Sequence, residues 1–136
     1  MLTRRSLLIA TALAPAAAAV PVFAASLTTF DANAFADAQK AGKPILIAVH
    51  ATWCPTCKAQ APILSELRAD PKFHDLVYFV IDFDGPKDLL KRFDVQMQST
   101  LIAFKGSAEV GRSVGDTDKD SIYALVGKTL GGTGNS

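Results

Sequence analysis

An unbroken apolar run, Ile45 to Val49, is the feature of this sequence that most constrains its fold. Successive side chains of a β-strand point to opposite faces of a sheet, so a strand that is apolar at every position is buried on both faces. Strands of this kind are typical of parallel sheets that are covered by helices on both sides. We therefore expect a central sheet between two helical layers.

The rest of the chain alternates between strand and helix patterns. Asp31 is suited to cap one helix and Pro55 to begin another, while Thr117 and Asp120 approximate a capping box for the last helix. The predicted elements follow the order βαβαβαββα and span residues 27–30, 31–41, 45–50, 55–68, 76–83, 87–93, 100–105, 109–114 and 117–130. This order predicts a single α/β domain with a mixed sheet. The phenylalanines expected in its core are Phe73, Phe79, Phe83, Phe93 and Phe104.

The first 25 residues have the pattern of a bacterial export signal. Arg4 and Arg5 precede an apolar stretch, and small residues end it at Ala24 and Ala25. The stretch is shorter than the roughly 20 apolar residues of a membrane-spanning helix, and Pro15 interrupts it. We expect cleavage during export to the periplasm, by either the twin-arginine or the general secretory route, and no stable membrane insertion afterwards.

Removal of residues 1–25 leaves a chain with nearly balanced charge. The whole chain has 14 basic and 13 acidic residues, and the segment contains two arginines and no acid, so 12 basic and 13 acidic residues remain, a net charge of −1. The absence of a basic patch from the sequence argues against nucleic acid or an anionic membrane surface as a partner. We expect residues 26–131 to form the domain and residues 132–136 to be a flexible tail.

Cys54 and Cys57 are the two cysteines of the chain, and they follow the predicted buried strand. A structural disulfide gains most by closing a long loop, so such a close pair is better explained as a reactive one. A helix N-terminus favours an anion, which suits Cys54 as the attacking thiolate, with Cys57 one turn further on to resolve a mixed disulfide. Zinc needs four ligands, and with His50 and His74 as the available histidines we expect no metal site.

The motif Trp53-Cys54-Pro55-Thr56-Cys57-Lys58, set between a strand and a helix, resembles that of the thioredoxin superfamily, and the resemblance covers about residues 26–131. Pro62 falls where that family has a helix-kinking proline, and the pair Val114-Gly115 also matches. The resemblance implies a thioredoxin-like fold, an exposed attacking Cys54 and a resolving Cys57. The supporting residues that it implies are His50, Trp53, Pro55, Thr56 and Lys58. It also implies protein thiols and disulfides as substrates and no cofactor beyond the Cys54–Cys57 disulfide itself.

The loop expected to dock the substrate departs from the family pattern. It comprises Gln98, Ser99 and Thr100, and Ser99 stands where the family has a cis-proline. A cis bond before a residue other than proline costs about 2.5–4 kcal/mol. We therefore expect the Gln98–Ser99 bond to be trans or strained.

Two further departures concern the protons and charges near the cysteines. The family's buried acid falls at Ala48 and its lysine neighbour at Tyr78, so the usual proton acceptor for Cys57 is missing. His50 occupies a position that is often aromatic in the family. As an imidazolium it would lower the pKa of Cys54, and as a neutral ring it would fill space at the strand end.

The sequence thus predicts a periplasmic thiol–disulfide oxidoreductase that acts as a reductase or an electron relay. Residues 70–73 look like part of the soluble C-terminal domain of membrane thiol–disulfide transporters, which suggests such a transporter as the electron donor. The alternative is an assembly factor that handles copper or another soft metal through Cys54, Cys57 and His50. The motif alone does not determine the direction of electron flow.

Overall fold

The structure is a computed structural model that describes residues 28–131. Its elements, in chain order, are β1 (Thr28–Thr29), α1 (Ala32–Lys40), β2 (Pro44–His50), α2 (Pro55–Ala69), the 3₁₀ turn η1 (Pro71–Phe73), β3 (Val77–Asp82), α3 (Lys87–Arg92), β4 (Thr100–Lys105), β5 (Ala108–Val114), α4 (Lys119–Gly127) and the 3₁₀ turn η2 (Lys128–Leu130). The predicted order of strands and helices is confirmed. The export signal expected at residues 1–25 and the tail expected at 132–136 lie outside the described residues. Within residues 28–131, no helix is long and apolar enough to cross a membrane.

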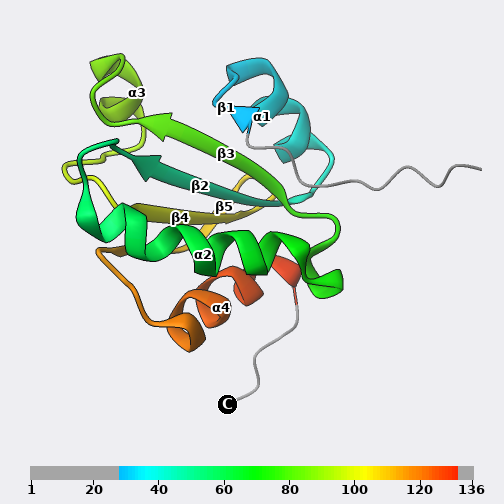
Figure 1. Cartoon of the computed structure of the whole chain (residues 1–136). Helices are drawn as coiled ribbons and strands as arrows, with labels where there is room; N and C mark the ends of the chain where they lie inside the picture. The colour runs from blue at the N-terminus through cyan, green and yellow to red at the C-terminus, as the bar shows by residue number, and fades with distance from the viewer. Residues whose placement is uncertain (1–27, 132–136) are drawn as a thin grey trace, which may run out of the picture.

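The five strands form one mixed sheet in the order β1-β3-β2-β4-β5. β3 runs parallel to β1 and to β2, whereas β4 runs antiparallel to β2 and to β5. Figure 1 shows α1 and α3 on one side of this sheet and α2 and α4 on the other. β2 therefore lies in the middle of the sheet between two helical layers, as its unbroken apolar sequence predicts.

Alternating side chains of β2 divide the core into two halves. Ile45, Ile47 and Val49 lie in the half that contains residues of α1 and α3, and Leu46 and Ala48 lie in the half beneath α2 and α4. Among the phenylalanines expected in the core, four are buried, namely Phe73, Phe79, Phe93 and Phe104, and Phe83 is half-buried. The core prediction is confirmed for those four residues.

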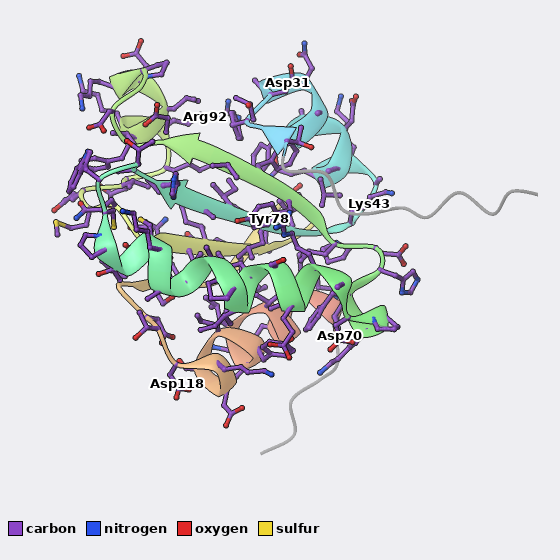
Figure 2. All side chains as sticks on the ribbon, in the orientation of Figure 1. Asp31, Lys43, Asp70, Tyr78, Arg92 and Asp118 are labelled. Carbon is purple, nitrogen blue, oxygen red and sulfur yellow. The ribbon has the colours of Figure 1, made fainter. Side chains whose placement is uncertain are left out.

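Three aspartates cap the helical segments that begin just after them, and Figure 2 labels Asp31, Asp70 and Asp118 at the starts of α1, η1 and α4. The predicted capping box at Thr117 is wrong by one residue. The N-cap is Asp118, and α4 begins directly after it at Lys119. The carboxylate of Asp118 accepts a hydrogen bond from the Ser121 backbone N–H at 2.8 Å. An aspartate at this position satisfies an unpaired N–H and also places a negative charge at the positive end of the helix.

Candidate active site

The turn after β2 brings both cysteines to one end of the sheet. Cys54 donates its backbone N–H to the Ala51 carbonyl at 3.2 Å and then serves as the N-cap of α2. Pro55 follows at the first helical position, where its missing N–H costs nothing. Cys57 lies one turn further into α2, and its backbone N–H donates to Cys54 Sγ at 3.1 Å. The sulfur of Cys54 therefore takes the capping role that a serine or aspartate oxygen usually has.

Both cysteines are free thiols in this structure. Burial raises the pKa of Cys54, but hydrogen bonds from the Cys57 side chain, the Ser99 hydroxyl and the backbone N–H groups of Cys57 and Thr56 outweigh it. The net result is a lowered pKa for Cys54. The thiolate is the nucleophilic form of cysteine, so these bonds favour Cys54 as the sulfur that attacks a disulfide.

The sulfur of Cys54 is covered, which corrects the expectation of an exposed attacker. Cys54 has a relative exposure of 0% and Cys57 one of 4%. The physical reason is that Ala51 and Phe83 pack against the cysteines while the Ser99 hydroxyl lies 3.1 Å from Cys54 Sγ. A substrate disulfide has to displace part of this cover before the sulfurs can meet.

Ser99 contacts both sulfurs from the loop that precedes β4. Its Oγ lies 3.1 Å from Cys54 Sγ and 3.2 Å from Cys57 Sγ. No peptide bond among residues 28–131 is cis, so the Gln98–Ser99 bond is trans. The backbone of Ser99 has a φ of +62°, in the left-handed region that residues other than glycine rarely adopt. Such strain persists only where the surrounding structure holds it, and it is concentrated at functional sites.

Three hydrogen bonds hold the backbone of Ser99 in this conformation. Its N–H donates to the Val49 carbonyl at 2.9 Å, and its own carbonyl accepts from the Gly115 N–H at 3.0 Å and from Gln60 Nε2 at 3.2 Å. Gln60 Nε2 also donates to the Asp116 carbonyl at 2.8 Å. Gln60 thereby joins α2 to the loops before β4 and after β5, a role that the sequence analysis missed. The available signal was a single amide on the otherwise apolar buried face of α2.

The other predicted site residues surround this centre. Trp53 is exposed, and its indole N–H donates to the Asp84 carboxylate at 2.6 Å, a partner that sequence reasoning did not find. Thr100 is buried and its hydroxyl donates to the Met97 carbonyl at 2.7 Å, whereas Gln98 is half-buried. Lys58 is exposed and touches the centre through its backbone N–H, which donates to the Cys54 carbonyl at 3.2 Å.

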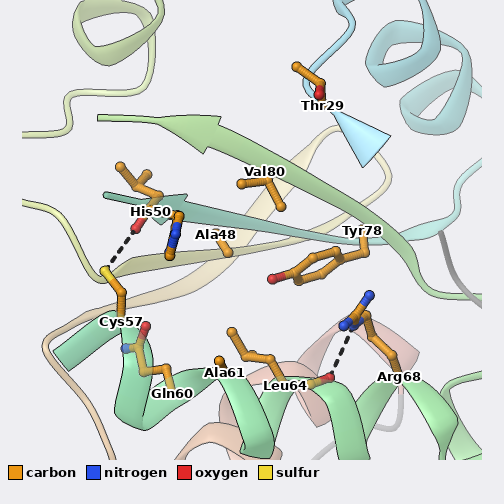
Figure 3. A pocket seen from close by; sticks show the side chains of 11 residues that line it. Thr29, Ala48, His50, Cys57, Gln60, Ala61, Leu64, Arg68, Tyr78 and Val80 are labelled. Carbon is orange, nitrogen blue, oxygen red and sulfur yellow. Dashed lines mark hydrogen bonds between the residues drawn. The ribbon is translucent and has the colours of Figure 1, made fainter. Parts of the chain in front are cut away.

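A cavity of about 360 Å³ lies beside Cys57, between α2 and the sheet (Figure 3). Ala48 lines it, and no carboxylate among the described residues does. In the register of β2 and β3, Ala48 pairs with Val80 and Leu46 pairs with Tyr78. Tyr78 lines the same cavity as Ala48, and burial raises the pKa of Tyr78. The small side chain of Ala48 thus leaves space at the position where the family has a buried acid.

His50 also lines this cavity, and Figure 3 shows its ring directed from the sheet toward α2. Its residue surface is exposed, so it does not fill closed space at the strand end. The groups that lower the pKa of Cys54 do not include it either. Both roles suggested for His50 are therefore unsupported. Within residues 28–131, no three His, Cys, Asp or Glu side chains gather closely enough to hold a metal ion.

The fold and the close cysteine pair at a helix N-terminus together define a thiol–disulfide oxidoreductase. A family model described as Thioredoxin matches residues 25–128, and the chain belongs to the thioredoxin family. A thioredoxin from Chlamydia muridarum is 37% identical over 94 residues, which is 69% of this chain and 89% of that protein. The crystal structure of Trxlp from Edwardsiella tarda EIB202 shares 40% identity and a TM-score of 0.71, covering 74% of this chain and 98% of that one. The bifunctional thioredoxin reductase/thioredoxin of Mycobacterium leprae is 35% identical over 92 residues, but the matched part is only 20% of that longer protein.

We expect iodoacetamide to modify Cys54 before Cys57, and at a lower pH than an ordinary thiol requires. The lowered pKa of Cys54 keeps its thiolate populated as the pH falls, and alkylation follows the thiolate. The measurement is mass-mapped labelling of the reduced protein between about pH 5 and pH 9, which spans the ordinary thiol pKa of about 8.5. In urea the two cysteines should react alike, and modification of Cys57 first in the folded protein would reverse the assigned roles.

Proposed function

We propose that this enzyme is exported to the bacterial periplasm, where it reduces protein disulfides or relays electrons to other thiol proteins, and that a membrane thiol–disulfide transporter supplies those electrons. The observation that carries the proposal is the closely spaced pair Cys54 and Cys57 at the N-terminus of α2, where hydrogen bonds lower the pKa of Cys54. The export pattern of residues 1–25 supports the location. The similarity to thioredoxins, one of them joined to a thioredoxin reductase, supports the direction of electron flow.

The proposed cycle moves two electrons to the substrate. The Cys54 thiolate attacks one sulfur of a substrate disulfide and releases the other as a thiolate. Cys57 then attacks Cys54 Sγ, which forms the Cys54–Cys57 disulfide and releases the second substrate sulfur as a thiol. A donor dithiol has to reduce the enzyme disulfide again. A membrane thiol–disulfide transporter that presents such a dithiol to the periplasm is therefore a suitable partner.

The reduction potential of the Cys54–Cys57 pair tests this direction. Hydrogen bonds that stabilise the Cys54 thiolate also stabilise the reduced enzyme, so the potential reports on the direction in which electrons flow. A value more negative than about −200 mV, within the range of thioredoxins and glutaredoxins, supports a reductase or relay. A value nearer the about −120 mV of a strong oxidant contradicts it.

The alternative function, handling of copper or another soft metal, ranks second because within residues 28–131 no third His, Cys, Asp or Glu side chain joins the two cysteines in a metal-binding group. Titration of the reduced enzyme with Cu(I), in competition with a chelator, distinguishes the two functions. Tight binding that requires both cysteines, together with negligible disulfide reduction, would favour the alternative.

A further inference from the structure

The hydroxyl of Ser99 lies within hydrogen-bond distance of both sulfurs, and its single proton limits how these bonds are arranged. A hydroxyl donates one hydrogen bond and accepts others, so Ser99 can donate to only one sulfur at a time. When it donates to the Cys54 thiolate, its lone pairs remain available for the thiol proton of Cys57. In this arrangement of donors the three groups form a directed chain from Cys57 through Ser99 to the sulfur at the helix N-terminus.

We propose that Ser99 is a catalytic residue that carries the proton of Cys57 to the departing substrate sulfur when Cys57 resolves the mixed disulfide. The proposal rests on the thiol–disulfide exchange assigned to this pair, and it deepens that function by naming the proton carrier. It also explains how a pair without the usual buried acid can complete the second step.

Few other groups in the site can accept the thiol proton of Cys57. The cavity on the other side of Cys57 is lined by Ala48 and, among the described residues, by no carboxylate. The Val49 carbonyl is 3.9 Å from Cys57 Sγ, which is long, and a carbonyl has no proton to pass on. The other side chains lining this cavity that can exchange a proton are His50, Thr29 and Tyr78.

The step balances in atoms and electrons. In the mixed disulfide, Cys54 Sγ is bonded to the substrate sulfur and no longer carries a charge. As Cys57 Sγ attacks Cys54 Sγ, its proton passes to Ser99 Oγ, while the original hydroxyl proton of Ser99 passes to the substrate sulfur. One S–S bond forms and one breaks, the substrate leaves as a neutral thiol, and Ser99 is again a neutral hydroxyl.

The backbone of Ser99 is built to hold its hydroxyl at this point. Hydrogen bonds with Val49, Gly115 and Gln60 fix the residue in a left-handed conformation that costs free energy for a side chain with a Cβ. A glycine would adopt this conformation without that cost. Ser99→Gly therefore removes the hydroxyl while preserving the backbone, which makes it the variant of choice.

The experiment follows single turnovers of reduced Ser99→Gly with a dialkyl disulfide and with an aromatic disulfide, both in excess. Acid quenching and mass spectrometry count the mixed disulfide and the closed Cys54–Cys57 disulfide over time. An alkyl thiolate is a poor leaving group that needs a proton, whereas an aromatic thiolate leaves readily without one. We expect resolution of the alkyl mixed disulfide to slow on the order of 100-fold, the lower range for loss of an acid–base group. Resolution of the aromatic one should slow by less than about tenfold.

Controls separate the relay from structural effects and from failure of the exchange function. Ser107→Gly, an exposed change in the turn between β4 and β5, should resolve both disulfides like the wild-type enzyme. Ser99→Ala, which also lacks the hydroxyl, should show the same selective defect as Ser99→Gly. Equal slowing with both disulfides, no slowing with either, or the selective defect appearing in His50→Gln instead would overturn the relay. A wild-type enzyme that forms no closed disulfide would instead contradict the exchange function itself.

Discussion

Cys57→Ser is expected to stop the enzyme after its first chemical step. The variant retains the Cys54 thiolate and the N-terminus of α2 that stabilises it, so it still attacks a disulfide. It lacks the sulfur that would resolve the product, and a serine hydroxyl does not replace it. Each molecule should therefore form one mixed disulfide with a substrate protein and then remain bound to it. Non-reducing gels of the purified variant mixed with insulin, or with a periplasmic extract, should show these adducts, and dithiothreitol should remove them.

Cys54→Ser is the matched control, because it keeps a cysteine one turn further into the same helix. It should form few adducts and reduce no insulin, since the remaining Cys57 is not the sulfur at the helix N-terminus. Equal trapping by the two variants would show that the two sulfurs are interchangeable attackers. An absence of adducts with Cys57→Ser would contradict disulfide exchange through Cys54.

The elements that bear the cysteines could be predicted because their signals are local. The apolar run of β2 indicates burial on both faces, and Pro55 directly after Cys54 indicates the start of a helix. These signals come from neighbouring residues, whose effect on the backbone is largely independent of the rest of the fold. The family resemblance rests on the same short motif, which explains why the fold and the cysteine pair could be recognised together.

The environment of the sulfurs could not be predicted in the same way, because it is made by segments far apart in the chain. Ser99 lies 45 residues after Cys54 and contacts it only because β4 pairs with β2. The bond between Gln60 and Asp116 joins residues 56 positions apart. The sequence marked position 99 as a departure from the family pattern. The two short contacts of its hydroxyl, and the cover that they form over Cys54, became visible only with the tertiary structure.

Phe35→Ala is expected to produce the largest loss of stability among changes outside the active site. Phe35 is 2% exposed, and its ring lies 5.4 Å, centroid to centroid, from each of Phe30, Phe93 and Phe104 and 6.0 Å from Phe79. Removing a buried phenyl ring costs about 3–5 kcal/mol, because the apolar contacts are lost and a cavity remains. Small domains are stable by only about 5–15 kcal/mol, so the variant should approach the unfolding threshold. Urea denaturation followed by circular dichroism measures the change.

Phe35→Ala, together with two control variants, tests whether stability and cysteine reactivity are separate properties of this fold. The ring cluster around Phe35 lies in the core half beneath α1 and α3, whereas the cavity beside Cys57 lies beneath α2 on the other face of the sheet. Phe35→Leu should lose less free energy of unfolding than Phe35→Ala because it leaves a smaller void, and Val114→Ala, at an exposed position, should lose almost none. The folded fraction of each variant should keep the alkylation midpoint of Cys54, because none of these side chains contacts the sulfur. A loss below about 1 kcal/mol in Phe35→Ala would show that the cluster relaxes around the void. A shifted midpoint would show that packing beneath α1 controls the thiolate from across the sheet.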